Sequence, residues 1–134
     1  MKTLIPYIFF QGNCEEAINY YKECLDGEIT AIQRFGDTEM PVEDGYKDKI
    51  MHSELKAENI HIMFSDGAPH KEIVVGDNVQ LSINLDSTEE QDRIFEALAK
   101  DGEITMPLEN TFWGARYGML KDKFGIRWML NCEV

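Results

Sequence analysis

Asp26-Gly27-Glu28-Ile29-Thr30 is repeated without change as Asp101-Gly102-Glu103-Ile104-Thr105, 75 positions later in this 134-residue chain. The similarity extends in both directions, because further pairs of segments match at offsets of 66, 65 and 74. These pairs are Met40-Pro41-Val42-Glu43 with Met106-Pro107-Leu108-Glu109, Leu55-Lys56 with Leu120-Lys121, and Asn13 and Glu16 with Ser87 and Glu90. Internal similarity of this kind indicates two copies of one supersecondary unit. We therefore expect two similar halves, with any binding site between them.

Length and charge narrow the possible classes of protein. A chain of 134 residues fits a single domain, residues 1–134. Its 13 Lys and Arg stand against 25 Asp and Glu, which gives a net charge of −12. This negative charge repels phosphate backbones, so nucleic acid is not an expected partner.

Apolar runs, the first residues and the cysteines indicate the cellular compartment. No apolar run approaches the ~20 residues of a membrane span. The first residues lack the apolar core and cleavage site of a secretion signal. The three cysteines, Cys14, Cys24 and Cys132, are odd in number and have no zinc-like spacing. We expect a cytoplasmic protein with free thiols and no membrane partner.

The first half predicts a strand, a helix and three further strands. Asn13 and Glu16 have the spacing of a capping box, and the helix then runs to Leu25. Gly27 is expected to supply the left-handed residue that ends the helix. The four predicted strands cover residues 4–10, 29–35, 50–56 and 60–65.

The second half repeats this order. Ser87 with Glu90 is expected to cap a helix that runs to Lys100 and ends at Gly102. The predicted strands cover residues 79–85, 103–106, 116–121 and 125–131. The sequence therefore predicts an α+β fold of two tandem βαβββ modules, residues 1–66 and 78–134. The linker 67–77 is rich in Gly, Pro and polar residues.

Three of these strands alternate in character, because successive side chains of a strand point to opposite faces of the sheet. The apolar sets, expected beneath the helices, are Ile60, Ile62 and Phe64; Val79, Leu81, Ile83 and Leu85; and Ile126, Trp128, Leu130 and Cys132. The opposite, mixed sets are His61, Met63 and Ser65; Gln80, Ser82 and Asn84; and Arg127, Met129 and Asn131. A face of mixed character suits a solvated surface or the wall of a ligand cavity.

Several motifs carry a likeness to a known family over essentially the whole chain. They are Gly12-Asn13-Cys14-Glu15-Glu16-Ala17, Tyr20-Tyr21-Lys22, Phe64-Ser65-Asp66, Met106 to Gly114 with its Thr-Phe-Trp-Gly end, and Asp122 to Ile126 followed by Trp128, Met129 and Asn131. With paired βαβββ units, these motifs resemble the PhnB-like branch of the vicinal oxygen chelate superfamily, which includes glyoxalase I, extradiol dioxygenases and bleomycin-resistance proteins. The resemblance implies a glyoxalase-like fold, in which two modules form a curved mixed sheet around a concave cavity. It also implies that two chains commonly pair as a homodimer.

The resemblance implies a divalent metal as well, held by one side chain from the first and one from the last strand of each module. Aligned by helix starts and strand ends, these places fall on Pro6, Met63, Gln80 and Met129. None of the four has a carboxylate or an imidazole, the ligands that such an ion prefers. We therefore expect no metal at the usual position, and no other cofactor.

The candidate catalytic residues are His61 and His52, either of which is a possible general base or hydrogen-bond donor. A structural or surface histidine is the alternative for both. Trp113 is either the aromatic wall of a pocket or the anchor of its loop. Arg127 and Asn131 are placed to hold an anionic ligand, against the alternative of an arginine paired with a nearby carboxylate. The expected ligand-binding residues are Phe10, His61, Met63, Gln80, Ser82, Asn84, Trp113, Arg127, Met129 and Asn131.

Three functions fit this sequence. The first is a metal-free protein that binds a small molecule between the modules. The second is an enzyme of the superfamily that uses a displaced metal or histidine acid–base chemistry. The third is an assembly module whose mixed face forms a dimer interface. A usual methyltransferase fold is not expected, because the glycine-rich turn after the first strand and the long parallel sheet are missing.

Overall fold

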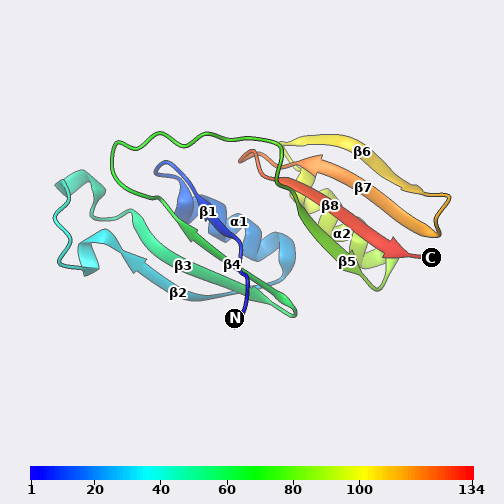
Figure 1. The fold of residues 1–134 in the computed structure, drawn as a ribbon, viewed down its shortest axis with the longest axis horizontal. Helices are drawn as coiled ribbons and strands as arrows, with labels where there is room; N and C mark the ends of the chain where they lie inside the picture. Colours follow the sequence, from blue (N-terminus) through cyan, green and yellow to red (C-terminus); the bar gives the residue numbers. More distant parts are fainter. The chain divides into compact units, whose positions relative to one another are not determined.

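The computed structural model describes residues 1–134, which divide into two compact units, Met1–Val74 and Val75–Val134. Each unit contains one βαβββ module (Figure 1). The first consists of β1 (Tyr7–Phe9), α1 (Cys14–Leu25), β2 (Glu28–Arg34), β3 (Ile50–Ala57) and β4 (Ile60–Ser65). The second consists of β5 (Leu81–Leu85), α2 (Thr88–Ala99), β6 (Glu103–Asn110), β7 (Ala115–Lys121) and β8 (Arg127–Glu133). The predicted α+β fold of two βαβββ modules is confirmed. That the modules enclose a cavity stays a prediction.

The two sheets have the same topology. Their strand orders are β1-β4-β3-β2 and β5-β8-β7-β6, and only the first pair of each sheet is parallel. The registers also correspond, since Tyr7 lies opposite Met63 in the first sheet and Ser82 lies opposite Met129 in the second. In the antiparallel pairs, Lys56 lies opposite His61 and Lys121 lies opposite Arg127. Positions in the two modules can therefore be matched one to one.

The repeated pentapeptide forms the same helix-to-strand connection in both modules. The left-handed residues are Asp26, with φ 52°, and Asp101, with φ 61°. The expectation that Gly27 takes this conformation is wrong, and Gly102 does not take it either. Those glycines are required for space, because an added Cβ would meet the carbonyl oxygen of Lys56 at Gly27 and that of Lys121 at Gly102. The short Asp side chain tolerates the left-handed region, which leaves the glycine free for the close approach.

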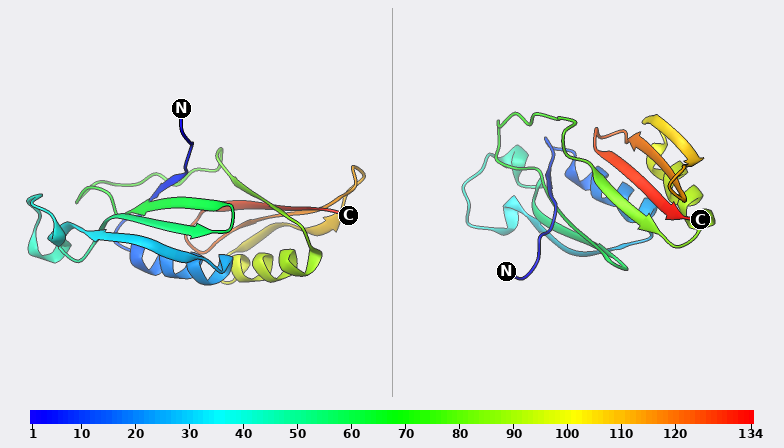
Figure 2. Two further views of the ribbon diagram at one scale, coloured as in Figure 1. Left: turned by 90° about the horizontal axis from the view of Figure 1, so that it is seen from below. Right: turned by 45° about the vertical axis from the view of Figure 1, so that its right-hand side comes forward.

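In each module the helix covers one face of its own sheet (Figure 2). In the first, Tyr21 is fully buried and its ring stacks on Phe64 at a centroid distance of 5.5 Å. In the second, Trp128 and Leu130 of β8 are buried beneath α2 with Leu98. The predicted apolar face is confirmed for Ile62, Phe64, Trp128, Leu130 and Cys132, all of which are buried.

Buried polar groups attach α2 to its sheet. The amide of Gln91, which is fully buried, donates hydrogen bonds to the carbonyl oxygens of Arg116 and Leu130, on β7 and β8. Arg116 in turn donates to the Gln91 side chain and pairs with Asp92 at 2.7 Å. Both polar ends of the Gln91 side chain therefore have partners, which is what a buried polar group requires.

Several local predictions differ from the structure. Val79 lies outside β5 and is 74% exposed, so it does not join the apolar face. Ser87 caps α2 as expected, by accepting a hydrogen bond from the Glu90 backbone N–H at 3.1 Å. The side chain of Asn13 makes no such bond at the start of α1. The carboxylate of Asp66 accepts there instead, as described below. Neither helix is long and apolar enough to cross a membrane.

Candidate functional site

The face of the first sheet that α1 leaves uncovered carries a connected group of polar side chains. β3 contributes His52 and Glu54, which alternate with the buried Ser53 and Leu55. Neighbouring strands contribute Tyr7 from β1 and His61 from β4. The pleat of the sheet places these side chains on one face.

Hydrogen bonds join the four residues in a row. Glu54 Oε1 lies 2.7 Å from Nε2 of His61, and Glu54 Oε2 lies 3.1 Å from Nε2 of His52. The hydroxyl of Tyr7 lies 2.8 Å from Nδ1 of His52. We call this group the Tyr-His-Glu-His row. Both oxygens of one carboxylate are thus occupied by two imidazoles.

The electrostatics of the row indicate the charge states of its carboxylate and its phenol. The hydrogen bonds from His61 and then His52 hold the pKa of Glu54 below its ordinary value, so the carboxylate is ionised at neutral pH. Burial raises the pKa of Tyr7, so its phenol keeps its proton. An ionised Glu54 accepts from Nε2–H of each histidine, and Tyr7 then donates to Nδ1 of His52. Nδ1 of a neutral His61 is left as an acceptor with no hydrogen-bond partner in the protein.

Apolar groups lie beside the row. Met63 of β4 is half-buried and lies opposite both Tyr7 and Glu54 in the sheet register. Phe9 of β1 is 48% exposed, and its ring stacks on that of Tyr7 at 5.0 Å. An imidazole acceptor, aromatic rings and a thioether on one exposed face are suited to hold a small molecule with polar and apolar parts.

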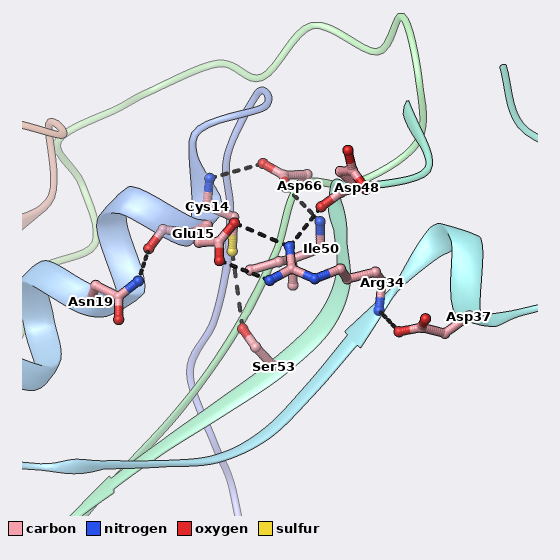
Figure 3. Close-up of polar contacts among 9 residues, drawn as sticks. All are labelled: Cys14, Glu15, Asn19, Arg34, Asp37, Asp48, Ile50, Ser53 and Asp66. Carbon is pink, nitrogen blue, oxygen red and sulfur yellow. Dashed lines mark hydrogen bonds and ion pairs between the residues drawn. The ribbon is translucent and has the colours of Figure 1, made fainter. Parts of the chain in front are cut away.

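A second polar cluster, at the start of α1, is structural (Figure 3). Asp66 is buried and accepts hydrogen bonds from the backbone N–H groups of Gly12, Cys14 and Ile50, at 2.8, 2.9 and 2.8 Å. Burial and then the charge of Asp66 raise the pKa of the Cys14 thiol to about 12. Cys14 is therefore a protonated core residue and not a nucleophile.

Arg34 joins the same helix to the end of β2 (Figure 3). Its two terminal nitrogens meet both oxygens of Glu15, at 3.1 and 2.8 Å, and one of them also donates to the carbonyl oxygen of Asp48. This bidentate pair is a local brace, and it satisfies the guanidinium within the protein.

The uncovered face of the second sheet carries a different set of side chains. Met129 accepts a hydrogen bond from the Tyr117 hydroxyl at 2.8 Å, and Asn131 donates to Asn84 at 3.3 Å. Ser82 lies opposite Met129 in the register and is exposed. The structure therefore brings Ser82, Asn84, Met129 and Asn131 together on one face. Arg127 lies on the same face of β8, two residues before Met129.

Other predicted ligand-binding residues lie elsewhere. Phe10 is 5% exposed and its ring lies 6.1 Å from that of Phe64, so it belongs to the core beneath α1 and not to the uncovered face. Gln80 precedes β5 and donates to the carbonyl oxygen of Asp77. Trp113 is 58% exposed in the β6–β7 turn, in edge contact with Phe112 and Tyr117. It is therefore not a core anchor of its loop.

The sequence prediction missed Tyr7 and Glu54. Alternation along β3 carried the signal for Glu54, because it is two residues from His52 and therefore on the same face. Nothing in the sequence near Tyr7 indicated its partner, since the hydrogen bond to His52 spans 45 residues.

Tyr7 lies opposite Met63 and Ser82 lies opposite Met129, so these four are the places of the metal ligands that the resemblance implies, if the register is used to match them. Tyr7 and Ser82 replace the predicted Pro6 and Gln80. A phenol, a hydroxyl and two thioethers do not form a ligand set for a divalent ion of the oxygen-preferring kind. No group of three or more His, Cys, Asp or Glu side chains is arranged to hold a metal ion. The residues present do not fit the usual metal.

Comparison with known proteins identifies the family. The family model described as 3-demethylubiquinone-9 3-methyltransferase matches residues 2–131. Protein YjdN of Escherichia coli (strain K12) is 32% identical, covering 96% of this chain and 93% of its own length. Protein PA1353 of Pseudomonas aeruginosa has a crystal structure that is 41% identical, with a TM-score of 0.89 over 99% of this chain and 98% of its own. A putative 3-demethylubiquinone-9 3-methyltransferase, PhnB protein, from Bacillus cereus is 28% identical, with a TM-score of 0.82 over 98% and 99%.

A more distant structure shows the fold alone. The glyoxylase/bleomycin resistance protein/dioxygenase domain from Frankia sp. EAN1pec is 14% identical, with a TM-score of 0.65 over 100% of this chain and 93% of its own. The chain therefore belongs to the family described as 3-demethylubiquinone-9 3-methyltransferase, with a PhnB protein among its similar structures and the fold of a glyoxylase/bleomycin resistance protein/dioxygenase domain.

Proposed function

We propose that this protein binds a small organic molecule on the uncovered face of its first sheet, without a divalent metal at the superfamily's usual position. The observation that carries the proposal is the Tyr-His-Glu-His row, with Nδ1 of His61 left as an acceptor beside exposed aromatic rings. Half-buried groups with unused hydrogen-bonding capacity, next to apolar surface, are typical of ligand sites.

The row also sets the chemistry of the ligand. Nδ1 of a neutral His61 accepts a hydrogen bond, so the ligand presents an N–H or O–H group there. The rings of Tyr7 and Phe9 and the thioether of Met63 favour an aromatic or aliphatic part next to that donor. The expected ligand is therefore a small amphipathic molecule with at least one donor.

A thermal-shift screen with small aromatic alcohols, amines and amides tests this proposal. A compound present at about 100 times its Kd stabilises the folded state by about 2.7 kcal/mol. His61→Ala is expected to remove the stabilisation. His70→Ala is the matched control, because His70 also pairs with a glutamate, Glu43, but is exposed. Equal stabilisation of the wild type and His61→Ala by every active compound would refute the site.

Acid–base catalysis is the second candidate function, and one contact favours it. The 2.7 Å hydrogen bond that His61 donates to Glu54 orients the His61 ring and leaves its other nitrogen free, which is the arrangement of a general base held by a carboxylate. A bound compound with an acidic C–H should then incorporate deuterium from D₂O. Glu54→Gln should slow this exchange more than it weakens binding, whereas a pure binding site gives no exchange in either protein.

Metal involvement has its own test. The purified protein is titrated with Ni²⁺ and Mn²⁺ while ligand binding is followed, and the metal content is measured after purification. A metal-free mechanism predicts that ligand affinity is unchanged by either ion and by chelator.

Pairing of two chains is a further proposal, as is a cytoplasmic location. The uncovered faces expose large apolar side chains, with Phe9 at 48% and Met106 at 45%, which supports an apolar contact surface. Light scattering is expected to give twice the chain mass, and Met63→Arg should yield a folded monomer if this face is the interface. If Met63→Arg still has twice the chain mass, the dimer interface does not include this face.

The family description names a methyltransferase, and we do not extend that activity to this chain. A usual methyltransferase sheet is long and parallel, with a glycine-rich turn after its first strand. Each sheet here has one parallel pair, and β1 leads into α1 through Gln11-Gly12-Asn13.

A further inference from the structure

Arg127 is an arginine without a partner in a strongly acidic protein. Its Nε is buried and forms no hydrogen bond. By contrast, Arg34 and Arg116 are each paired with a carboxylate. An unsatisfied, partly buried guanidinium is costly, and a molecule with 25 acidic residues offers many possible partners.

The neighbour of Arg127 across the sheet is a second cation. Lys121 of β7 lies directly opposite Arg127 in the register, and like charges in that position repel. Lys121 has only a long contact of 3.9 Å with Glu103. The oxygens of the adjacent Asp122 accept hydrogen bonds from the N–H groups of Phe124, Ile126 and Trp128.

Comparison of the two modules shows that the second lacks a carboxylate on β7 beside Arg127. His61 of the first module occupies the place of Arg127, and Lys56 occupies that of Lys121. His61 is paired with Glu54, whose place in the second module is taken by Met119. The carboxylate that satisfies the cationic position in one copy is therefore absent from the other.

The two cations line one pocket of the second unit. Its volume is about 320 Å³, and its walls are Val75, Gly76, Asp77, Lys121, Gly125 and Arg127. Small-molecule sites start at about this size. Gly125 keeps the pocket open, since an added Cβ would lie 3.0 Å from Val75 and φ is +91°.

We propose that this pocket binds a small oxyanion, either inorganic or the anionic end group of a larger molecule, between Arg127 and Lys121. The planar guanidinium matches a phosphate or carboxylate with two parallel hydrogen bonds, and Lys121 adds a point charge. An anion between them would replace the missing carboxylate and remove the repulsion across the strands. Asp77 on the wall opposes anion binding, so affinity is limited by its charge.

The test uses the full chain and inorganic phosphate as the probe. Phosphate is expected to raise the unfolding temperature above that in sodium chloride of equal ionic strength. Arg127→Gln should weaken phosphate binding by at least about tenfold, because hydrogen bonds to a charged group are lost. Asp77→Asn should strengthen it. Arg93→Gln on the exposed face of α2 changes the net charge equally and should have little effect.

Sulfate and acetate identify the class of oxyanion, since binding of acetate alone indicates a carboxylate site. Arg127→Lys keeps the charge and loses the planar fork, so it should bind phosphate more weakly than the wild type even if Arg127→Gln does not fold. No stabilisation by any of the three anions, or equal losses in the Arg127 and Arg93 variants, would overturn the proposal. The site does not depend on the proposed function above, and His61→Ala should leave phosphate binding unchanged.

Discussion

Asp66 is the residue on which the geometry of the first module most depends. Its carboxylate joins three segments, because it accepts from Gly12 and Cys14 before and within α1 and from Ile50 at the start of β3. At 3% exposure, water cannot replace these bonds. The negative charge also lies at the helix N-terminus, where the helix dipole favours it.

Asp66→Asn should therefore be strongly destabilising. An amide offers one acceptor oxygen and turns N–H donors toward at least one of the three backbone N–H groups. We expect a loss of about 3 kcal/mol in the free energy of unfolding, measured with urea. Asp37→Asn is the control, since Asp37 is exposed and accepts from one backbone N–H, and it should cost less than about 1 kcal/mol.

Cys14 predicts how stability depends on alkaline pH. Burial raises its pKa to about 12 in the folded protein, whereas an unfolded cysteine titrates near 8.5. The folded state therefore holds the proton more tightly. Its contribution is fully present below the unfolded pKa and is lost as the pH rises toward 12. Between pH 8.5 and 10, the wild type should lose about 1.7 kcal/mol more than Cys14→Ala in urea unfolding. Equal losses would show that the thiol titrates normally.

Single residues of the site were partly predictable. Alternation placed His61 and Met63 correctly on the mixed face, because the pleat fixes sides without tertiary information. Alternation along β3 puts Glu54 on the same face as His52, but its contact with His61 on β4 is one that no local pattern encodes. Phe10 lies in the core and not on the uncovered face, because β1 ends at Phe9 and the next residue turns inward.

At the scale of elements, the repeated glycines provide the sharpest test. Gly102→Ala would drive a methyl group into the backbone of Lys121 and Asp122, whereas the equivalent Gly27 has slightly more room, with its nearest atom at 3.0 Å. We expect Gly102→Ala to cost about 3 kcal/mol and Gly27→Ala about half as much, in thermal or urea unfolding. Gly45→Ala meets nothing within 4 Å and should be neutral or slightly stabilising.

The order of elements was predictable because helix and strand periods differ and each helix has a start and a stop signal. The first and last residues of the elements were less predictable. β6 runs on to Asn110, four residues beyond the predicted end, because its pairing with β7 continues after Pro107. The start of α1 illustrates the limit of local rules. Asn13 and Glu16 have the spacing of a capping box, but the distant Asp66 provides the acceptor.

For the molecule as a whole, the repeat predicted two modules and their common topology. It did not predict where their side chains differ, because equivalent positions hold Glu54 and Met119, or His61 and Arg127. The backbone repeat follows from shared steric demands at the Asp-Gly connections. The differing side chains are the ones that carry the proposed chemistry.

Whether the two units unfold together can be measured from their fluorescence. Both tryptophans, Trp113 and Trp128, lie in the second unit, whereas Asp66 lies in the first. The chain length predicts a single cooperative domain. In that case Asp66→Asn should lower the unfolding midpoint by the same amount whether unfolding is followed by tryptophan fluorescence or by circular dichroism. A tryptophan transition that stays at the wild-type midpoint would establish two independently folding units.

The bond from Asp66 to the beginning of α1 spans 52 residues of chain, whereas Ser87 caps α2 from within its own turn. During synthesis from the N-terminus, α1 must therefore wait for its acceptor, and a ribosome that stalls within β3 would hold a helix whose first turn is unsecured. The later helix has no such delay. The nascent chain should be most vulnerable to proteases and most dependent on chaperones before residue 66 has emerged from the exit tunnel.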